Sequence, residues 1–226
     1  DIAILVVAAD DGIMPQTICV ILLKLQLLKM KFRMILDGYI KDKNNRPVKT
    51  ALVELKDNSF ETLYATYTDT TGYYKFDIPS GHYPFFLTVK GYKETGLEYW
   101  CQDIILNADL KLDAKIDTLE VYGLHAFSVK GAGNGLMVYF RPMSLDKYLR
   151  GAEDIAPDQI DIRVSVDGEE STIVNVNKVF ECAGTHKMPA YLIQTDSEKA
   201  DTWHKLDVEI WDENQNYGAA SVFNKL

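Results

Sequence analysis

The chain has 226 residues, enough for one large domain or for two domains of about 100 residues each. Its formal net charge of −9 argues against the basic surface that nucleic-acid binding requires. Hydrophobic residues make up 47% of the chain and charged residues 25%, a balance that favours a packed core over disorder.

Residues 18–23 form an apolar run that Lys24 interrupts, well short of the roughly 18 residues that a membrane span needs. Acidic residues stand at the start of the chain, where a secretory signal carries positive charge. We therefore expect no membrane span and a cytoplasmic location. Three cysteines are too few and too scattered for a disulfide framework or a zinc site: Cys19, Cys101 and Cys182.

Residues 1–17 read DIAILVVAADDGIMPQT, and their β-branched run suits a strand buried on both faces of a parallel sheet. This segment resembles one strand and turn of the translational GTPases, the initiation and elongation factors. The chain contains no GxxxxGK[ST] loop to hold phosphate and no NKxD motif to read the base. We interpret residues 1–29 as a GTPase-like fragment that is no independent domain, and we predict no nucleotide-binding residues.

Short strands with turn signals at regular intervals follow, at 35–42, 50–55, 62–69, 73–78 and 82–92. Such spacing predicts an all-β sandwich. In the strand at 73–78, alternation places Tyr74, Phe76 and Ile78 on the core face and Tyr73 on the opposite face. Pro84 cannot donate to a strand ladder, so we expect its strand to be at an edge or bulged.

The spacing G-x-(V/I)-x-D begins at Gly38, T-D-x-x-G-x-Y-x-F at Thr68 and I-P-x-G-x-Y at Ile78. With these motifs, residues 35–118 resemble the carboxypeptidase regulatory-like domain, a transthyretin-like β-sandwich, and we place this domain at 30–118. The resemblance implies a module that accompanies zinc carboxypeptidases without their catalytic apparatus. The H-x-x-E pair of those enzymes does not occur here, and we expect no catalytic residues, no metal and no cofactor.

Residues 119–226 are also rich in strand patterns and fit a second, immunoglobulin-like sandwich. One short helix is expected at 145–150, with Ser144 as its N-cap. The glycine-rich stretch 130–135 and the acidic stretch 212–218 are interpreted as hairpin turns, not as phosphate or calcium sites. The predicted strands are 119–129, 135–142, 160–168, 171–182, 190–196, 205–212 and 217–223.

The sequence therefore predicts two tandem β-sandwiches, with a short N-terminal extension, that act as a non-enzymatic binding or scaffolding protein for a glycan or a protein partner. Strand parity and loop position select Tyr73, Phe86 and Trp100 as outward-facing aromatic residues that could bind the ligand. An alternative is an enzyme with an active site between the sandwiches that uses carboxylates and His125, His186 or His204. A GTPase remnant that has lost nucleotide binding ranks last.

Overall fold

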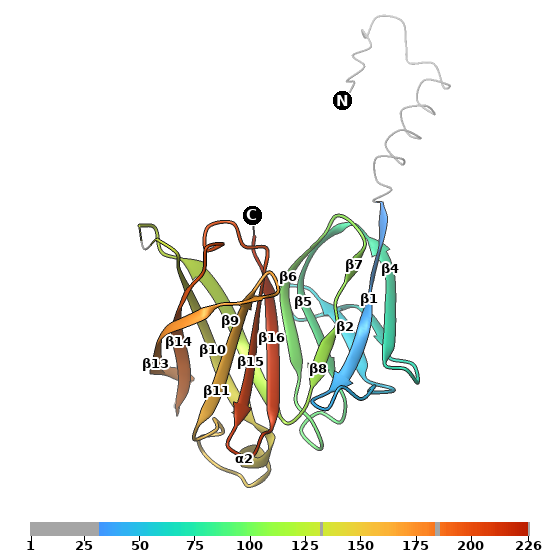
Figure 1. The fold of residues 1–226 in the computed structure, drawn as a ribbon. Helices are drawn as coiled ribbons and strands as arrows, with labels where there is room; N and C mark the ends of the chain where they lie inside the picture. Colours follow the sequence, from blue (N-terminus) through green and yellow to red (C-terminus); the bar gives the residue numbers. More distant parts are fainter. Residues whose placement is uncertain (1–31, 132, 184–185, 226) are drawn as a thin grey trace, which may run out of the picture. The chain divides into compact units, whose positions relative to one another are not determined.

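The computed structural model describes residues 32–131, 133–183 and 186–225, which form an almost entirely β structure (Figure 1). The predicted extension at 1–29, with Cys19, lies outside these residues. Within the described part of the chain, no helix is long and apolar enough to cross a bilayer.

The strands of the first sandwich lie between residues 33 and 116, and they include three strands after residue 98 that the sequence analysis did not identify. A four-stranded sheet has the order β4-β1-β7, with β8 also paired to β1. It packs over the segment β6-β5-β2-β3 of a larger sheet. The strands are β1 (Arg33–Asp42), β2 (Leu52–Lys56), β3 (Thr62–Tyr67), β4 (Tyr73–Pro79), β5 (Gly81–Val89), β6 (Tyr99–Leu106), β7 (Leu110–Lys111) and β8 (Ala114–Ile116).

Strand β4 shows the predicted alternation. Tyr74, Phe76 and Ile78 are buried in the first core, whereas Lys75 and Asp77 are exposed. Because successive side chains of a strand point to opposite faces, this pattern places one face of β4 on the core and leaves the other in solvent. The Tyr74 hydroxyl donates a hydrogen bond of 2.7 Å to the backbone oxygen of Leu112, which satisfies the buried phenol.

Strand β5 corrects two expectations. It lies between β2 and β6, and its register with β6 does not shift at Pro84, so the strand is neither at an edge nor bulged there. Phe86, expected to face outward, is 0% exposed and belongs to the first core, as does Tyr83 three residues earlier. Pro84 stands between these two residues, opposite Asp103, which has φ of 60°. The alternation changes face there, and a parity counted from Tyr83 therefore assigns Phe86 to the wrong side.

The second sandwich contains the predicted strands and one short strand, β12, that was not predicted. The sheet β13-β14-β10-β9 packs over the segment β12-β11-β15-β16 of the larger sheet. Helix α2 (Leu145–Leu149) has Ser144 at its N-cap position, but the Ser144 side chain makes no capping hydrogen bond. The strands are β9 (Leu119–Ser128), β10 (Gly135–Ser144), β11 (Ile160–Val166), β12 (Glu169–Glu170), β13 (Thr172–Ala183), β14 (His186–Asp196), β15 (Lys205–Asp212) and β16 (Tyr217–Phe223).

The acidic stretch after β15 is a hairpin turn, as predicted. The Asp212 carboxylate accepts the backbone N–H groups of Asn214 and Asn216, at 2.9 and 2.8 Å. It also accepts the side-chain amide of Asn216 at 2.9 Å. The turn thereby uses the carboxylate to order its own backbone.

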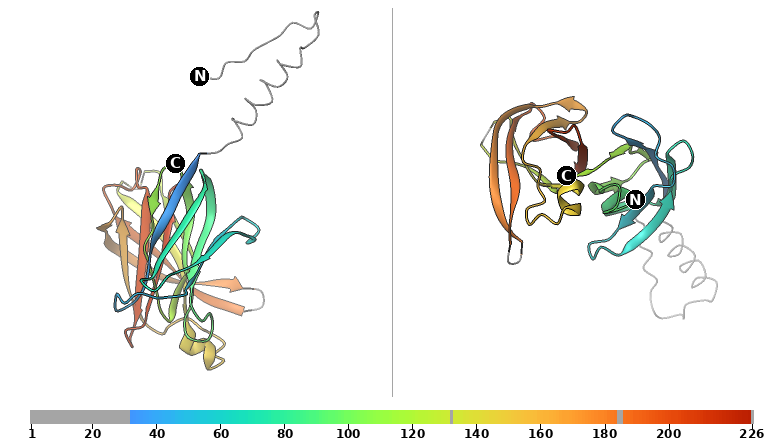
Figure 2. Two further views of the ribbon diagram at one scale, coloured as in Figure 1. Left: turned by 90° about the vertical axis from the view of Figure 1, so that its right-hand side faces the viewer. Right: turned by 90° about the horizontal axis from the view of Figure 1, so that it is seen from below.

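One eight-stranded sheet, in the order β12-β11-β15-β16-β6-β5-β2-β3, passes through both sandwiches. The two halves join where β16 pairs in parallel with β6, with Ala220 opposite Trp100. Neighbouring residues of β16 enter different cores, Ala219 the first and Ala220 the second. Residues 34–226 form one compact unit, in which two cores share one sheet and both include residues of β16 (Figure 2). The domain boundary at 118/119 stays a prediction.

The chain is thus all-β and consists of two β-sandwiches, as the sequence predicts.

Candidate functional site

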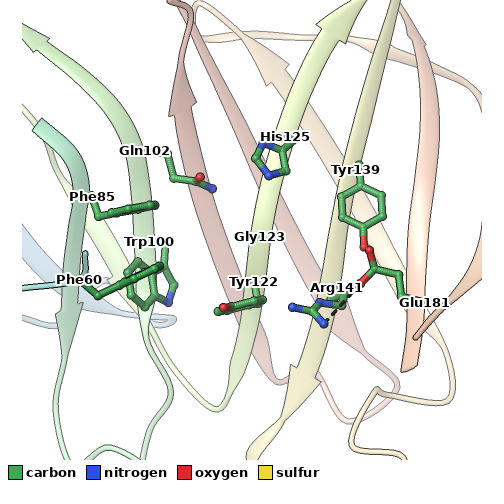
Figure 3. A pocket seen from close by; sticks show the side chains of 10 residues that line it. All are labelled: Phe60, Phe85, Trp100, Gln102, Tyr122, Gly123, His125, Tyr139, Arg141 and Glu181. Atoms are coloured by element: carbon green, nitrogen blue, oxygen red, sulfur yellow. Dashed lines mark ion pairs between the residues drawn. The ribbon is translucent and has the colours of Figure 1, made fainter. Parts of the chain in front are cut away.

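A pocket of about 360 Å³ opens beside the strands where the two sandwiches join, and we call it the junction pocket (Figure 3). One wall is aromatic and the other is polar. Residues from the β2–β3 loop, β5, β6, β9, β10 and β13 contribute to it. The lining residues are Phe60, Phe85, Trp100, Gln102, Tyr122, Gly123, His125, Tyr139, Arg141 and Glu181.

The aromatic wall is a continuous series of rings. Phe60 stacks on Phe85 with ring centroids 4.6 Å apart and an interplanar angle of 15°. Trp100 meets Phe85 edge to face at 6.2 Å, and Tyr122 meets Trp100 in the same way at 6.4 Å. Edge-to-face and offset contacts are the geometries that aromatic quadrupoles favour. Phe60 is 51% exposed, so part of this wall remains open to a ligand.

The polar wall contains a charged pair in contact with the last ring of the series. The Arg141 guanidinium lies over the Tyr122 ring, 4.8 Å from its centroid, and forms an ion pair of 3.3 Å with Glu181. The Tyr139 hydroxyl lies beside the Glu181 carboxylate (Figure 3). Burial, together with that carboxylate, raises the pKa of the Tyr139 phenol well above its usual range. These side chains offer both donors and acceptors to a bound molecule.

A bulge in β9 creates the spacing of this wall. Tyr139 of β10 pairs with His125 of β9, and Arg141, two residues later, pairs with Tyr122, three residues earlier. The strand β9 therefore has one extra residue at this point. Gly123 has φ of +64°, a left-handed conformation that glycine adopts without strain. Tyr122 and His125 therefore both line the pocket although they are three residues apart. A Cβ on Gly123 would meet no atom within 4 Å, so the backbone is open at this point.

Two side chains of β6 connect the pocket to the second sandwich. The Gln102 side-chain amide donates a hydrogen bond of 2.7 Å to the backbone oxygen of Leu124, within the bulge. The indole Nε1–H of Trp100 donates one of 3.0 Å to Oε1 of Glu120. These bonds fix the position of the aromatic wall relative to the bulge.

The three aromatic residues predicted from the sequence do not come together. Trp100 lines the junction pocket, whereas Phe86 is buried in the first core. Tyr73 is half-buried on β4, and its hydroxyl donates a hydrogen bond of 2.7 Å to Asp37. Tyr73 does not line the junction pocket.

Sequence reasoning missed most of the pocket. Phe85 could have been found, because Pro84 predicted an irregularity in the strand just before it. Tyr122, Arg141 and Glu181 have no local signal, because β13 comes near β9 and β10 only through its pairing with β14.

Two of the histidines proposed for an enzyme occupy different surroundings. His125 lines the junction pocket, whereas the exposed His204 lies 3.5 Å from the Asp167 carboxylate. His186 begins β14, and its side chain lies outside the described part of the structure. No group of three or more His, Cys, Asp or Glu residues arranged to hold a metal occurs within the described ranges.

The structure is similar to several solved proteins at low identity. A putative carbohydrate binding protein from Bacteroides uniformis has 11% identity and a TM-score of 0.31, over 84% of this chain and 99% of that one. A DUF3823 family protein from Bacteroides ovatus has 10% identity and a TM-score of 0.29, over 84% and 98%. The major pilin subunit of Bacillus cereus has 13% identity and a TM-score of 0.30, over 84% and 67%. Likeness at this level carries no inference about function.

No curated protein matches the chain. The model of the carboxypeptidase regulatory-like domain family matches residues 35–113, where the turn motifs and the first β-sandwich lie. The resemblance to this family that the sequence predicted is therefore confirmed over residues 35–113.

Proposed function

We propose that this protein is a non-enzymatic carbohydrate-binding protein and that the junction pocket holds the sugar. The observation that carries the proposal is the aromatic series from Phe60 to Tyr122 facing the Arg141–Glu181 pair across one pocket. A sugar ring has apolar C–H faces and a polar hydroxyl rim. The C–H face suits the negative π-face of an aromatic ring. The hydroxyls suit a pair that both donates and accepts hydrogen bonds.

The size of the pocket favours a small ligand, such as part of a saccharide, over a protein partner. A stable protein interface buries about 1,600 Å² of surface in total, far more than one concave site provides. Small-molecule sites commonly measure roughly 300–1,000 Å³ and combine apolar walls with a few polar groups. The junction pocket, at about 360 Å³, belongs in the lower part of that range.

The lining residues favour binding over glycoside cleavage. Glycosidases commonly place two carboxyl groups on either side of the scissile bond, at about 5–10 Å from each other. Glu181 is the one carboxylate among the described residues that line the pocket, and it is ion-paired with Arg141. A single carboxylate engaged in this way suits recognition of hydroxyl groups.

The test is binding of the purified chain to a glycan array, followed by calorimetry with any saccharide retained. Phe85→Ala and Arg141→Ala should each weaken binding about tenfold or more, because aromatic and arginine anchors dominate such contacts. Tyr67→Ala is the matched control, since Tyr67 is a 65% exposed aromatic residue on β3, outside the pocket.

Equal affinity for Phe85→Ala, Arg141→Ala and the unmodified chain would contradict the proposal. Chromatography of the saccharide after incubation tests the enzyme alternative, and release of shorter products would replace binding by catalysis as the function.

A further inference from the structure

Glu120 is a buried carboxyl group directly behind the aromatic wall. It is 1% exposed, and it lies on β9 opposite Met143 of β10. Its Oε1 accepts the indole N–H of Trp100 at 3.0 Å. Its Oε2 lies 3.4 Å from the backbone nitrogen of Glu98, which donates to it. A carboxyl group removed from water in this way is costly to ionise.

The surroundings of Glu120 favour its neutral form. Burial is the largest influence on its pKa and Glu98 is the second, and together they raise the pKa of Glu120 to about 8. Burial also raises the pKa of Glu98, and Glu54 adds to the effect while Lys56 opposes it. At pH 7 Glu120 is therefore mostly protonated. The charged groups that act on this pair are Lys93 after β5 and, for Glu98, Glu54 and Lys56 of β2. Tyr92, also after β5, interacts with both carboxyl groups and with Tyr122 of β9 and Tyr148 of α2.

We propose that Glu120 is a positioning residue of the junction pocket. Its protonated carboxyl group holds the indole of Trp100 in the pocket wall, and loss of the proton weakens binding there. Only the identity of the ligand in this proposal rests on the proposed function. The link between Glu120 and Trp100 stands on their hydrogen bond.

The direction of the effect follows from desolvation and charge. An ionised Glu120 would place a second carboxylate beside Glu98 at a buried position. A charge-assisted bond to the indole N–H would offset part of that cost. Burial and the neighbouring Glu98 raise the pKa of Glu120 although that bond acts in the opposite direction. We expect the ionised side chain to move toward water, which removes the partner that fixes Trp100.

The first experiment needs no ligand. The full chain has three tryptophans, so labelling with 5-fluorotryptophan gives three ¹⁹F signals, and Trp100→Phe assigns one of them. The Trp100 signal should shift with a midpoint near pH 8, the pKa of Glu120. The Trp203 and Trp211 signals should show no step at that pH. Glu120→Gln keeps an acceptor oxygen for the indole and should abolish the step.

Two further variants distinguish positioning from general damage. Glu98→Gln removes the neighbouring charge and should move the midpoint to lower pH. Glu213→Gln changes an exposed carboxylate in the β15–β16 turn and should leave the midpoint unchanged. A Trp100 signal that stays constant from pH 6 to pH 10 would overturn the proposal. So would a step that persists in Glu120→Gln.

The second experiment measures the affinity of a saccharide retained by the unmodified chain, at pH 6.5 and pH 9. Binding should be about five- to tenfold weaker at pH 9, the effect of losing one hydrogen-bond partner. Glu120→Gln should bind equally at both pH values. A normal Trp100 titration with pH-independent affinity would contradict the role in binding.

If no saccharide binds at any pH, the proposed function fails, and the ¹⁹F titration still decides whether Glu120 positions Trp100.

Discussion

Tyr99 and Ser221 are hydrogen-bonded at the join of the two sandwiches, with their hydroxyl oxygens 2.7 Å apart. Tyr99 is 4% and Ser221 1% exposed, and they lie on β6 and β16, the two strands that pair there. The Ser221 hydroxyl also donates to the Asp207 carboxylate, which forms an ion pair of 2.8 Å with Lys205. A chain of polar groups thus runs across the neighbouring strands β6, β16 and β15 where the two sandwiches join.

Tyr99→Phe should lower the free energy of unfolding by about 1 kcal/mol, the usual net worth of a hydrogen bond. The cost stays in this range because Ser221 retains Asp207 as its acceptor. Urea unfolding measures the change, and Tyr67→Phe, at an exposed position, should cause none.

Because the two sandwiches share one sheet, we expect them to unfold together. Calorimetry of the chain should show one unfolding transition for residues 34–226, because β16 contributes to both cores. Two separated transitions would show that each sandwich unfolds independently of the other.

Phe85 and Phe86 are adjacent in sequence and should respond to truncation in opposite ways. Phe86→Ala empties a fully buried site and should cost about 3–5 kcal/mol of stability. Phe85→Ala removes a half-buried ring of the pocket wall and should cost about 1 kcal/mol of stability, while saccharide binding weakens about tenfold or more. Equal losses of stability would mean that both rings belong to the core.

Gly123→Ala should cost about 1 kcal/mol, because an alanine at φ of +64° is strained although its Cβ has room. Binding should weaken as well, since the bulge sets the spacing of Tyr122 and His125. Gly151→Ala is the matched control, with φ of +69° and open space after α2. It should lose similar stability in a thermal melt and keep the affinity of the unmodified chain.

The raised pKa of Glu120 should make the free energy of unfolding depend on pH. Its pKa rises from 4.5 to about 8 on folding, so between these values the folded chain holds a proton that the unfolded chain has lost. Stability from this group is fully present below pH 4.5, falls at up to about 1.4 kcal/mol per pH unit, and is lost above pH 8. Urea unfolding at pH 5.5 and pH 9 should show the fall, and Glu120→Gln should reduce it. An unchanged slope in that variant would assign the dependence to other groups.

The sequence alone determined the elements whose signals are local. Alternation from Tyr74 to Ile78 identified β4 and its buried face. The turn residues around Gly72 and Gly81 identified the family resemblance predicted for 35–118, which the family model matches over 35–113. Helix α2 and the strands of the second sandwich followed from the same period and turn chemistry. Such signals persist in the fold because each depends on neighbours within a few residues.

Only the tertiary structure decided how the halves join and where the pocket lies. The pairing of β6 with β16 brings together residues more than a hundred positions apart, which no local period encodes. The alternation of β5 changes face at Pro84, so Phe86 turns inward. The bulge at Gly123 adds a residue to β9, so Tyr122 and His125 share one face. The register of a strand, and the face on which each of its side chains lies, depend on which strands become its neighbours. The packing of the two cores on one sheet determines those neighbours.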